Sequence, residues 1–455
     1  MEKPNIILMV MDSARHDHMP LYGYSKNITP NIDEFAKDAA VFENAFTTSN
    51  WTLPTHASIF TGLYPSQHNV NAMDSILGKD IPTIAGILQK EGYETISVIM
   101  NPWLGKGFGL DKGFSVVDDV AEKRNNFFVK VYYKLLKTFG FLGRAFLINY
   151  IAKKHVDDCL KKEKPFFLFL NYMDAHYKFE PPIPYRSKYL PKGISYGQIK
   201  KASVIEHEHN AGKKAISEQD LDNINLLLDS SIEYLDFEIG RLFNFLKERG
   251  IFDNTLIILT SDHGDLFCEH KNWLGHRHFL YEELIRIPLL IRYPKLFGAS
   301  RTKGIVQITD IFPTILDAVG VKEESKALLG KSLIKRIKEK DFLKFAIAEQ
   351  PVAVLDVYKN HHPDFDVTPI NSKQRAIRTL KYEYILSSDG KDELYNIEED
   401  PKETKNLVEQ RKDIRDALKG LMDEWLDKLP KLDKAKSKEE ASEEMKKRLG
   451  ELGYF

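Results

Sequence analysis

The sequence predicts an α/β protein: a large, mixed but mostly parallel sheet sandwiched by helices, followed by a smaller C-terminal α+β domain with an antiparallel sheet. Two apolar runs support the prediction of a mostly parallel sheet. They cover residues 5–11 and 255–260, and both have the length and composition of strands that are buried on both faces. Each run ends in polar, ligand-type residues, as expected where a site lies at the carboxyl ends of parallel strands. After about residue 338 the pattern changes to short strand-like pieces joined by turns, which is typical of a small antiparallel sheet.

The composition describes a large globular protein without a strong overall charge. The 455 residues are 43% hydrophobic, enough to bury a sizeable core. Lys and Arg number 65 against 66 for Asp and Glu, and the net charge of −1 predicts no general attraction to polyanions, so we expect no nucleic-acid partner. The two cysteines, Cys159 and Cys268, rule out a disulfide framework and agree with a reducing compartment.

The N-terminal residues show no targeting signal. They read Met1-Glu2-Lys3-Pro4 and enter a strand directly, without a basic region or a small-residue cleavage site. No apolar run approaches the roughly 18 residues needed to span a bilayer. We therefore expect a cytoplasmic protein without a transmembrane segment.

Thr52 stands where a helix is expected to begin. Pro54 suits the first turn of a helix from about Thr55 to Thr61, because proline has no N–H to donate and its φ is fixed. Thr52 then lies just before this helix, near free N–H groups that attract anions. A hydroxyl there can attack a tetrahedral oxyanion centre if a metal or an adjacent base lowers its pKa; otherwise Thr52 is an ordinary cap residue.

A further strand, 94–100, follows a predicted helix at 83–91. It ends at Asn101, at the level where the loops of a site should lie. Asn101 is therefore a candidate substrate ligand, although a turn residue before proline needs no function.

Residues 122–162 predict a helical cover. The part from 126 to 154 is apolar and basic at helical spacing, so it can make peripheral contact with a membrane or cap an apolar substrate. The alternative, an apolar stripe packed on the sheet, is favoured because amphipathic helices in soluble proteins normally face a core. The next strand, 166–170, delivers Asp174 and His176 to the same sheet edge.

Residues 186–219 are polar and interrupted by proline and glycine, so they predict a long surface loop, with His207 and His209 solvated. A long helix is expected over 221–249, where apolar residues recur at helical spacing. The strand at 255–260 follows it.

The sequence divides into two domains at about residue 338. The catalytic domain is expected to span 1–338 and the C-terminal domain 339–455. The second domain combines the short strands with an amphipathic helix at 413–429, and the alternating charges of 431–447 predict a solvated helix.

Two carboxylates, an imidazole and a hydroxyl are expected to meet at the carboxyl edge of the sheet. Asp12 follows the first strand, Asp262 and His263 follow the strand at 255–260, and Thr52 supplies the hydroxyl. This set could bind one divalent cation and deliver an activated alkoxide.

These motifs, in this order, resemble the sulfatase family of the alkaline-phosphatase superfamily over nearly the whole chain. The matching segments are Pro4 to Asp12, Thr29 to Asp33, Thr52 to Thr55, Thr61-Gly62, Pro65 to Val70, Asn171 to His176, Ser261 to Asp265, Leu280 to Glu283, Arg286 to Leu289, Asp310 to Thr314, Glu393 to Tyr395 and Asp400-Pro401. The resemblance implies an alkaline-phosphatase-like fold. It also implies metal ligands at Asp12, Thr52, Asp262 and His263.

The nucleophile departs from the family pattern. Sulfatases usually carry Cys or Ser at this place, with Arg two residues after the proline, and an enzyme converts that residue to formylglycine. This chain has Thr52, and His56 follows Pro54 by two residues. A secondary alcohol cannot become the same aldehyde, so we expect no formylglycine. Similar phosphodiesterases and phosphoglycerol transferases use threonine directly, which implies in-line attack of Thr52 on phosphorus and a phospho-threonine intermediate.

Three histidines complete the expected site. The resemblance implies that His176 is a donor to the leaving oxygen or a phosphate contact, and therefore both a catalytic and a substrate-binding candidate. His276 occupies the family's place for a Lys or His at the leaving group. His278 is the alternative substrate ligand, because the local spacing does not fix which of the two points inward.

The donor set suits Mg²⁺, Mn²⁺ or Ca²⁺ and tolerates Zn²⁺. His263 stands where many sulfatases have Asn, and Ser13 where they commonly have Asp, which favours Mn²⁺ or Zn²⁺ over Ca²⁺. Asp174 and His176 could form a second metal site with His276. One metal is expected instead, since two-metal relatives separate that Asp and His by three residues and a single residue intervenes here.

Three functions compete. The leading hypothesis is a metal-dependent hydrolase or transferase of phosphate diester, phosphonate or sulfate esters, on small molecules or on glycan- or lipid-linked groups. The second is a sulfuric ester hydrolase of arylsulfatase type that uses Thr52 unmodified. The third is a non-catalytic binding protein that retains the fold, against which the presence of all four metal-binding residue types argues.

Overall fold

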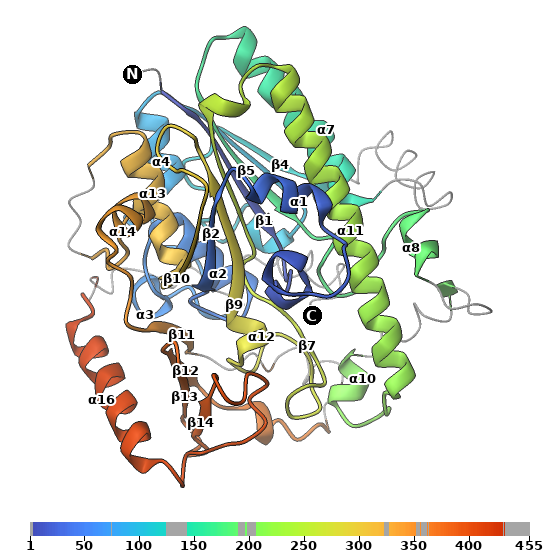
Figure 1. Cartoon of the computed structure of the whole chain (residues 1–455), viewed down its shortest axis with the longest axis vertical. Coiled ribbons are helices and arrows are strands. Elements are labelled where there is room, and N and C mark those ends of the chain that lie inside the picture. Colours follow the sequence, from blue (N-terminus) through green and yellow to red (C-terminus); the bar gives the residue numbers. More distant parts are fainter. Residues whose placement is uncertain are drawn as a thin grey trace.

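A computed structural model describes residues 3–73, 75–123, 143–189, 196–197, 206–322, 327–351, 355, 362, 364–430 and 432. The predicted α/β class is confirmed, because the main element is an eight-stranded sheet of order β10-β2-β9-β6-β1-β5-β3-β4 (Figure 1). Its strands are β1 (Asn5–Met11), β2 (Ala40–Phe46), β3 (Glu94–Ile99), β4 (Val116–Asp119), β5 (Phe166–Tyr172), β6 (Thr255–Thr260), β9 (Arg286–Arg292) and β10 (Ser300–Gln307). Neighbours are parallel except along β9, which runs antiparallel to β2 and β6.

The three central strands of the sheet are apolar because they are buried on both faces. β1 pairs in parallel with β5 on one side and β6 on the other, so that Val10 lies opposite both Asn171 and Thr260. Every residue of these three strands is buried. Strands covered on both faces read as continuous apolar runs, and their carboxyl ends share one edge of the sheet.

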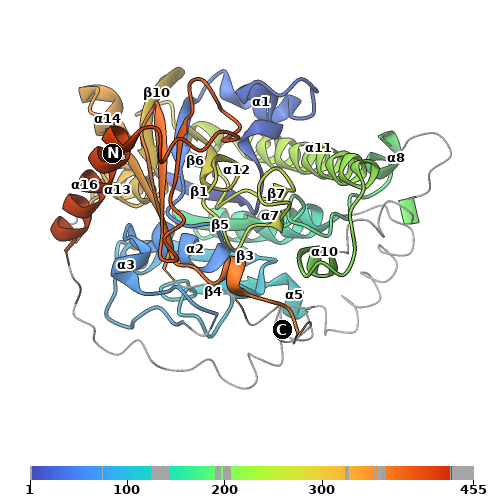
Figure 2. The same cartoon turned by 90° about the horizontal axis from the view of Figure 1, so that it is seen from below.

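Helices cover both faces of the sheet. One face carries α1 (Pro30–Ala36), α7 (Arg144–Lys161) and α11 (Glu218–Glu248), and the other carries α2 (Thr52–Thr61), α3 (Pro65–His68), α4 (Ile84–Lys90), α13 (Ile311–Ala318) and α14 (Leu333–Glu339) (Figures 1 and 2). The two apolar cores follow the period of the strands: Ile7 and Met9 belong to the first, Ile6 and Leu8 to the second.

The helical cover expected at 122–162 is described only in part, since 124–142 lie outside the described residues. Within it, α7 buries Ala145, Ile148, Ala152 and Val156 in the first core, so its apolar stripe faces the sheet. The proposed membrane contact falls largely on the undescribed part. Among the described helices, none has both the length and the hydropathy for a membrane span.

The C-terminal residues form the predicted antiparallel sheet, of order β11-β12-β13-β14. Its elements are β11 (Ala346–Gln350), β12 (Gln374–Arg378), β13 (Tyr382–Ser387), β14 (Glu393–Asn396) and the following α16 (Lys412–Lys428). This sheet packs on the large domain through a shared apolar cluster that includes Phe46 and Ile285 from one side and Ala348 and Ile385 from the other. The predicted charged helix at 431–447 lies almost wholly outside the described residues.

Short elements connect these layers. They are α5 (Val120–Lys123), α8 (Tyr185–Lys188), α10 (Glu206–Asn210), α12 (Glu282–Ile285), the small hairpin β7 (Leu266–Phe267) and β8 (Leu274–Gly275), and 3₁₀ turns at His16–His18, Pro20–Tyr22, Pro102–Leu104, Phe252–Asn254, Ile308–Asp310 and Thr368–Ile370.

The structure differs from the expectations in three places. β2 and β10 form one side of the sheet but had no clear apolar run, since polar residues interrupt both. α2 begins at Thr52, three residues earlier than expected, with Pro54 inside its first turn. The described part of 186–219 contains α8 and α10 rather than loop alone, and His209 is buried against the carbonyl oxygens of Lys214 and Asn272 instead of being solvated.

Candidate active site

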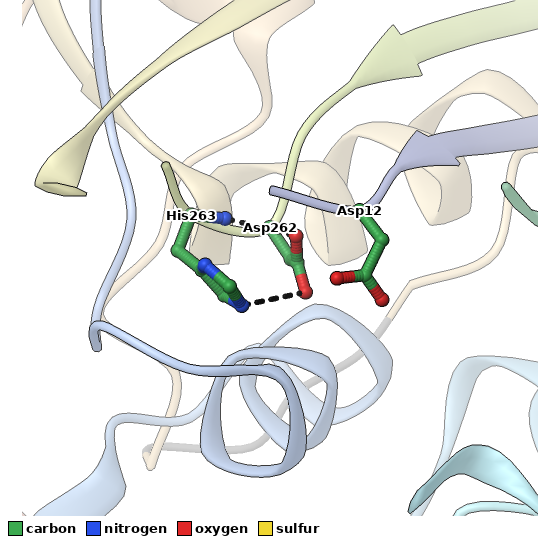
Figure 3. A group of neighbouring side chains, drawn as sticks. All are labelled: Asp12, Asp262 and His263. Atoms are coloured by element: carbon green, nitrogen blue, oxygen red, sulfur yellow. Dashed lines mark hydrogen bonds and ion pairs between the residues drawn. The ribbon is translucent and has the colours of Figure 1, made fainter. Parts of the chain in front are cut away.

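The ends of β1 and β6 bring three side chains together. Asp12 follows β1, and Asp262 and His263 follow β6; Figure 3 shows the three side chains converging on one point. One ligand atom from each lies within 4.8 Å of the others, and all three side chains are fully buried. The parallel register of the two strands places these residues side by side.

The hydrogen bonds of His263 fix its tautomer. Its Nδ1–H donates to the carbonyl oxygen of Gly264 at 2.9 Å, so Nε2 carries the lone pair. Nε2 lies 3.3 Å from Asp262 Oδ2 and 3.4 Å from Thr52 Oγ1. Burial lowers the pKa of His263 to about 4, which keeps the ring neutral. A neutral imidazole held by a carbonyl on its other nitrogen is the usual form of a metal ligand.

The two carboxylates are oriented differently. Asp262 Oδ1 accepts hydrogen bonds from the backbone N–H groups of Ser13 and His263, both at 3.0 Å. Ser13 adopts a left-handed φ of 59°, next to Asp12. Asp262 Oδ2 is buried and accepts no hydrogen bond from any described residue. Burial and the neighbouring Asp12 raise the pKa of Asp262 well above its usual value.

This donor set fits a divalent cation. Two carboxylates meet in a fully buried place, one of their oxygens lacks a partner among the described residues, and an imidazole lone pair faces it. Unpaired buried carboxylates are strongly unfavourable, and a cation compensates them. Oxygen ligands with one imidazole suit Mn²⁺ and Zn²⁺, and the identity of the metal stays a prediction.

Thr52 is the first residue of α2, and its hydroxyl faces the three ligands. Asn101 Nδ2 donates to Asp12 Oδ2 at 2.8 Å and to Thr52 Oγ1 at 3.3 Å, so Asn101 links the Asp12 carboxylate to the Thr52 hydroxyl. One turn later in α2, the Nδ1–H of His56 donates to the carbonyl oxygen of Thr52 at 2.8 Å. The same nitrogen lies 3.6 Å from Asp262 Oδ2.

Asn171 and His56 belong to the site but were not predicted as site residues. Asn171 Nδ2 donates to Asp12 Oδ2 at 3.1 Å, and its Oδ1 accepts from the backbone N–H of Asn101 at 3.0 Å. Its signal in the sequence was a polar residue inside an apolar strand. For His56 the signal was its position four residues after Thr52, on the same face of a helix.

A cavity of about 180 Å³ adjoins these residues. Its lining includes His176 and His276 together with three cationic side chains, Arg144, Lys178 and Arg277. Lys178 is exposed and holds a left-handed φ of 68°, a conformation that bulky residues rarely adopt without a constraint. With Glu206 as the acidic residue among its lining side chains, the cavity presents a net positive charge beside His176 and His276.

His276 is oriented by a carboxylate. Its Nδ1–H donates to Asp265 Oδ1 at 2.7 Å, which leaves Nε2 as the nitrogen available to a bound molecule. Its ring centre lies 4.2 Å from that of His263 and 5.3 Å from that of His176. His176 donates from Nδ1 to the carbonyl oxygen of Tyr177 at 3.1 Å.

His278 lies elsewhere. It is buried with its ring edge-on to Trp273, at 5.1 Å between centroids, and it is not among the residues that line the cavity. Trp273 instead lines a second cavity of about 410 Å³ between β8 and the C-terminal sheet. The structure thus separates the two histidines that the sequence left as alternatives.

Gly264 joins the site to α12. A Cβ at Gly264 would lie 1.9 Å from the carbonyl oxygen of Glu283, and the backbone N–H of Gly264 donates to the carbonyl oxygen of Leu284 at 3.0 Å. The absence of a side chain is what permits this close approach.

The sulfatase family model matches residues 4–321, which include every candidate residue described above. The chain belongs to the sulfatase family. The model of the C-terminal domain of N-sulphoglucosamine sulphohydrolase matches residues 268–430 and covers the small sheet. This sulfatase-family protein is therefore an ester hydrolase of a family with metal-dependent members.

Similar proteins span nearly the same length. An arylsulfatase of Clostridium perfringens is 25% identical, over 92% of this chain and 94% of that protein. Arylsulfatase K of Bos taurus is also 25% identical, over 92% of this chain and 80% of its own length.

Solved structures show the same fold. The phosphonate monoester hydrolase of Agrobacterium radiobacter superposes with a TM-score of 0.76 at 19% identity, over 94% of this chain and 95% of that chain. A protein solved in complex with its substrate D-glucosamine-2-N,6-O-disulfate gives 0.73 at 21% identity, over 96% and 100% of the two chains.

Proposed function

We propose that this sulfatase-family protein is a metal-dependent hydrolase or transferase of phosphate diester, phosphonate or sulfate esters, with the unmodified hydroxyl of Thr52 as nucleophile. The observation that carries the proposal is the position of Thr52 Oγ1, 3.4 Å from His263 Nε2 and 3.3 Å from the donor Asn101 Nδ2. Asp12, Asp262 and His263 would hold one divalent ion with Thr52. Mn²⁺ or Zn²⁺ is favoured, and Mg²⁺ or Ca²⁺ also suits the oxygen ligands.

When bound, the ion lowers the pKa of a nearby hydroxyl and stabilises developing negative charge. The chain's own residues do the rest. Thr52 Oγ1 gives up its proton to water and forms a bond to phosphorus, while the bond from phosphorus to the leaving oxygen breaks and that oxygen takes a proton from His276. Asn101 stabilises the charge on Oγ1 by donating a hydrogen bond to it. The free N–H groups at the start of α2 lie beside the reacting centre and attract its anionic oxygens.

His276 and His176 serve the leaving group. Asp265 holds the tautomer of His276, so that Nε2 is directed to substrate, as a carboxylate does for a catalytic imidazole in acyl transfer. Burial beside His263 and His176 lowers the pKa of His276, and an anionic substrate opposes that shift because it favours the protonated ring. The protonated ring then donates its proton to the leaving oxygen. Water or an acceptor alcohol takes the group from phospho-Thr52 in the second step.

The cavity favours an anionic substrate. Arg144, Lys178 and Arg277 line it, and guanidinium and ammonium groups bind phosphate and sulfate oxygens. Phosphorus is favoured over sulfur because an alkoxide such as Thr52 lacks the second hydroxyl by which a formylglycine hydrate expels sulfate. The second candidate, a sulfuric ester hydrolase of arylsulfatase type, is supported by the family match and by the arylsulfatase relatives.

The test compares Thr52→Ala with Thr52→Ser on a panel of bis-nitrophenyl phosphate, nitrophenyl phenylphosphonate and nitrophenyl sulfate. We expect Thr52→Ala to abolish turnover and Thr52→Ser to keep a substantial part, since serine loses only a methyl group that restricts χ1. Acid quench and peptide mass spectrometry should find phosphate mass on Thr52. Wild-type rates in Thr52→Ala would remove Thr52 from the mechanism, and a strong preference for the sulfate ester would select the second candidate.

A further inference from the structure

A second group of ligand-type side chains lies away from the active site, where the two sheets meet. His270 follows β7, Glu283 belongs to α12, and Glu403 follows β14. One ligand atom from each lies within 4.8 Å of the others. His270 Nε2 is 3.1 Å from Glu283 Oε2 and 4.0 Å from Glu403 Oε2. We call His270, Glu283, Glu403 and their neighbour Glu383 the interface cluster.

The nearby arginines are engaged by another carboxylate. Arg378 Nε binds Glu282 Oε2 at 2.8 Å, and Arg286 Nη1 binds Glu282 Oε1 at 2.9 Å. Glu282 is therefore compensated by two guanidinium groups, one on each of its carboxylate oxygens.

The carboxylates of the interface cluster are not compensated in this way. Glu383 is 0% exposed, and within the described ranges its oxygens have no hydrogen-bond partner other than the carboxyl group of Glu403. Its nearest cation is Arg378 Nε, at 3.4 Å. Glu403 is 2% exposed; Oε2 accepts from the backbone N–H of Glu282 at 2.8 Å, while Oε1 has no hydrogen-bond partner among the same residues.

Such an arrangement requires either protons or a cation, because a buried unpaired carboxylate is strongly unfavourable. The carboxyl groups of Glu383 and Glu403 interact with each other, so one proton shared by the two is the alternative to a cation. A shared proton accounts for Glu383 and Glu403 alone, and His270 Nε2 hydrogen-bonds Glu283 Oε2 at 3.1 Å, a contact that one ion bound by both side chains would replace. Bonds of roughly 2.0–2.2 Å to a central ion give ligand separations of about 3–4 Å, as found around His270.

We propose that His270, Glu283 and Glu403 bind a second divalent cation, with Glu383 supplying further negative charge. Imidazole with carboxylates suits Mn²⁺ or Zn²⁺. His270 and Glu283 come from the large sheet's connections, whereas Glu383 and Glu403 come from β13 and the segment after β14. The ion fastens the C-terminal sheet to the catalytic domain. The proposal does not depend on the function proposed above.

The experiment counts metal ions in the full chain. Each protein is equilibrated with Mn²⁺, and in parallel with Zn²⁺, passed through a desalting column and measured by inductively coupled plasma mass spectrometry. We expect two ions per chain in the wild type, one in Asp262→Ala, one in His270→Gln, and none in the double variant. His270→Gln should also unfold at a lower temperature, because it loses the ion at the interface.

Two results would overturn the proposal. One is a single ion in the wild type and none in Asp262→Ala, which assigns a shared proton to Glu383 and Glu403. The other is a second ion that persists in His270→Gln, which places it elsewhere. If His270→Gln fails to fold by circular dichroism, Glu403→Gln replaces it, and the wild type against Asp262→Ala still decides whether a second ion exists.

Discussion

The active site and the interface cluster use the same chemical groups in different surroundings. In the active site, Asp12, Asp262 and His263 lie at strand ends beside a hydroxyl and an open cavity. In the interface cluster, His270 and the glutamates lie between two domains, enclosed by the apolar side chains of the shared core. The comparison teaches that we should expect reactivity from buried carboxylates with an imidazole only where a hydroxyl and a space for substrate adjoin them. Between two domains, and with Glu283 the one partly exposed member of the three, the same groups are proposed to hold the domains together.

The largest expected effect is the loss of the active-site ion. Asp262→Ala or His263→Ala should lower kcat about a thousandfold, since the ion activates the nucleophile and stabilises charge. Metal content and turnover are measured on the same samples. Asp423→Ala, which removes an exposed carboxylate on α16 paired only with Lys419 among the described contacts, is the matched control and should behave as wild type. Normal metal content in Asp262→Ala would refute the assignment.

Asn101 tests how far the active site depends on hydrogen bonds around the ligands. Asn101→Ala removes the donor shared by Asp12 and Thr52 and should lower kcat by about a hundredfold. Asn171→Ala is the control, because Asn171 Nδ2 contacts Asp12 but has no recorded bond to Thr52. Its expected loss is about tenfold. Equal losses in the two variants would show that the bond to Thr52 contributes nothing.

His68 is a buried histidine that contacts no carboxylate among the residues that the structure describes. Its Nδ1 accepts from the backbone N–H of Val70 at 3.0 Å, its Nε2 lies 3.1 Å from Ser58 Oγ, and burial lowers its pKa to about 3. The folded pKa lies below the unfolded value of about 6.5, so stability is present above pH 6.5 and is lost as the pH falls toward 3. Between pH 7 and 5 the loss should be about 2 kcal/mol.

Urea unfolding at both pH values measures this effect in the wild type and in His68→Gln. The variant should be less stable at pH 7 but should lose about 2 kcal/mol less on acidification. The same pH dependence in both proteins would assign the acid sensitivity to other groups.

The smallest expected effect concerns the cationic rim of the cavity. Lys178→Ala should raise KM about fivefold for esters that carry a second anionic group, with little change in kcat, because an exposed ammonium contributes about 1 kcal/mol. A neutral analogue with the same reacting ester should keep its KM. Lys188→Ala, which is exposed on α8 and paired with Glu233, is the control. An equal rise in KM for both substrates would show that Lys178 does not bind the second anionic group of the ester.

The sequence predicted the parts of the molecule that one strand or one motif defines. Asp12, Asp262 and His263 were found because each follows an apolar strand. The α/β class and the C-terminal antiparallel sheet were predictable from local patterns in the same way, and the structure confirms both. The structure brings Thr52, Asn101, His176 and His276 to one place, while their catalytic roles, the metal and the cytoplasmic location stay predictions.

Contacts that depend on how the strands pair and how the domains dock could not be predicted from the sequence. Asn171 reaches Asp12 because β1 and β5 pair with Val10 opposite Asn171, and nothing local in either strand sets that alignment. The interface cluster likewise joins residues more than a hundred positions apart, from elements whose docking is decided by the apolar core between the sheets. β2 escaped notice because Glu43 and Asn44 interrupt its apolar pattern where the strand is less buried.

Substitution of Gly264 is expected to disturb both the active site and the interface cluster at once. The backbone of Gly264 touches that of Glu283, so a single methyl group at this position would displace a residue of the interface cluster and also shift the adjacent His263. Random libraries that target substrate preference would therefore be expected to lose all variants at position 264 in the selection for soluble protein. A designer who wishes to change the C-terminal domain independently of the chemistry must keep this glycine and vary the cavity rim instead.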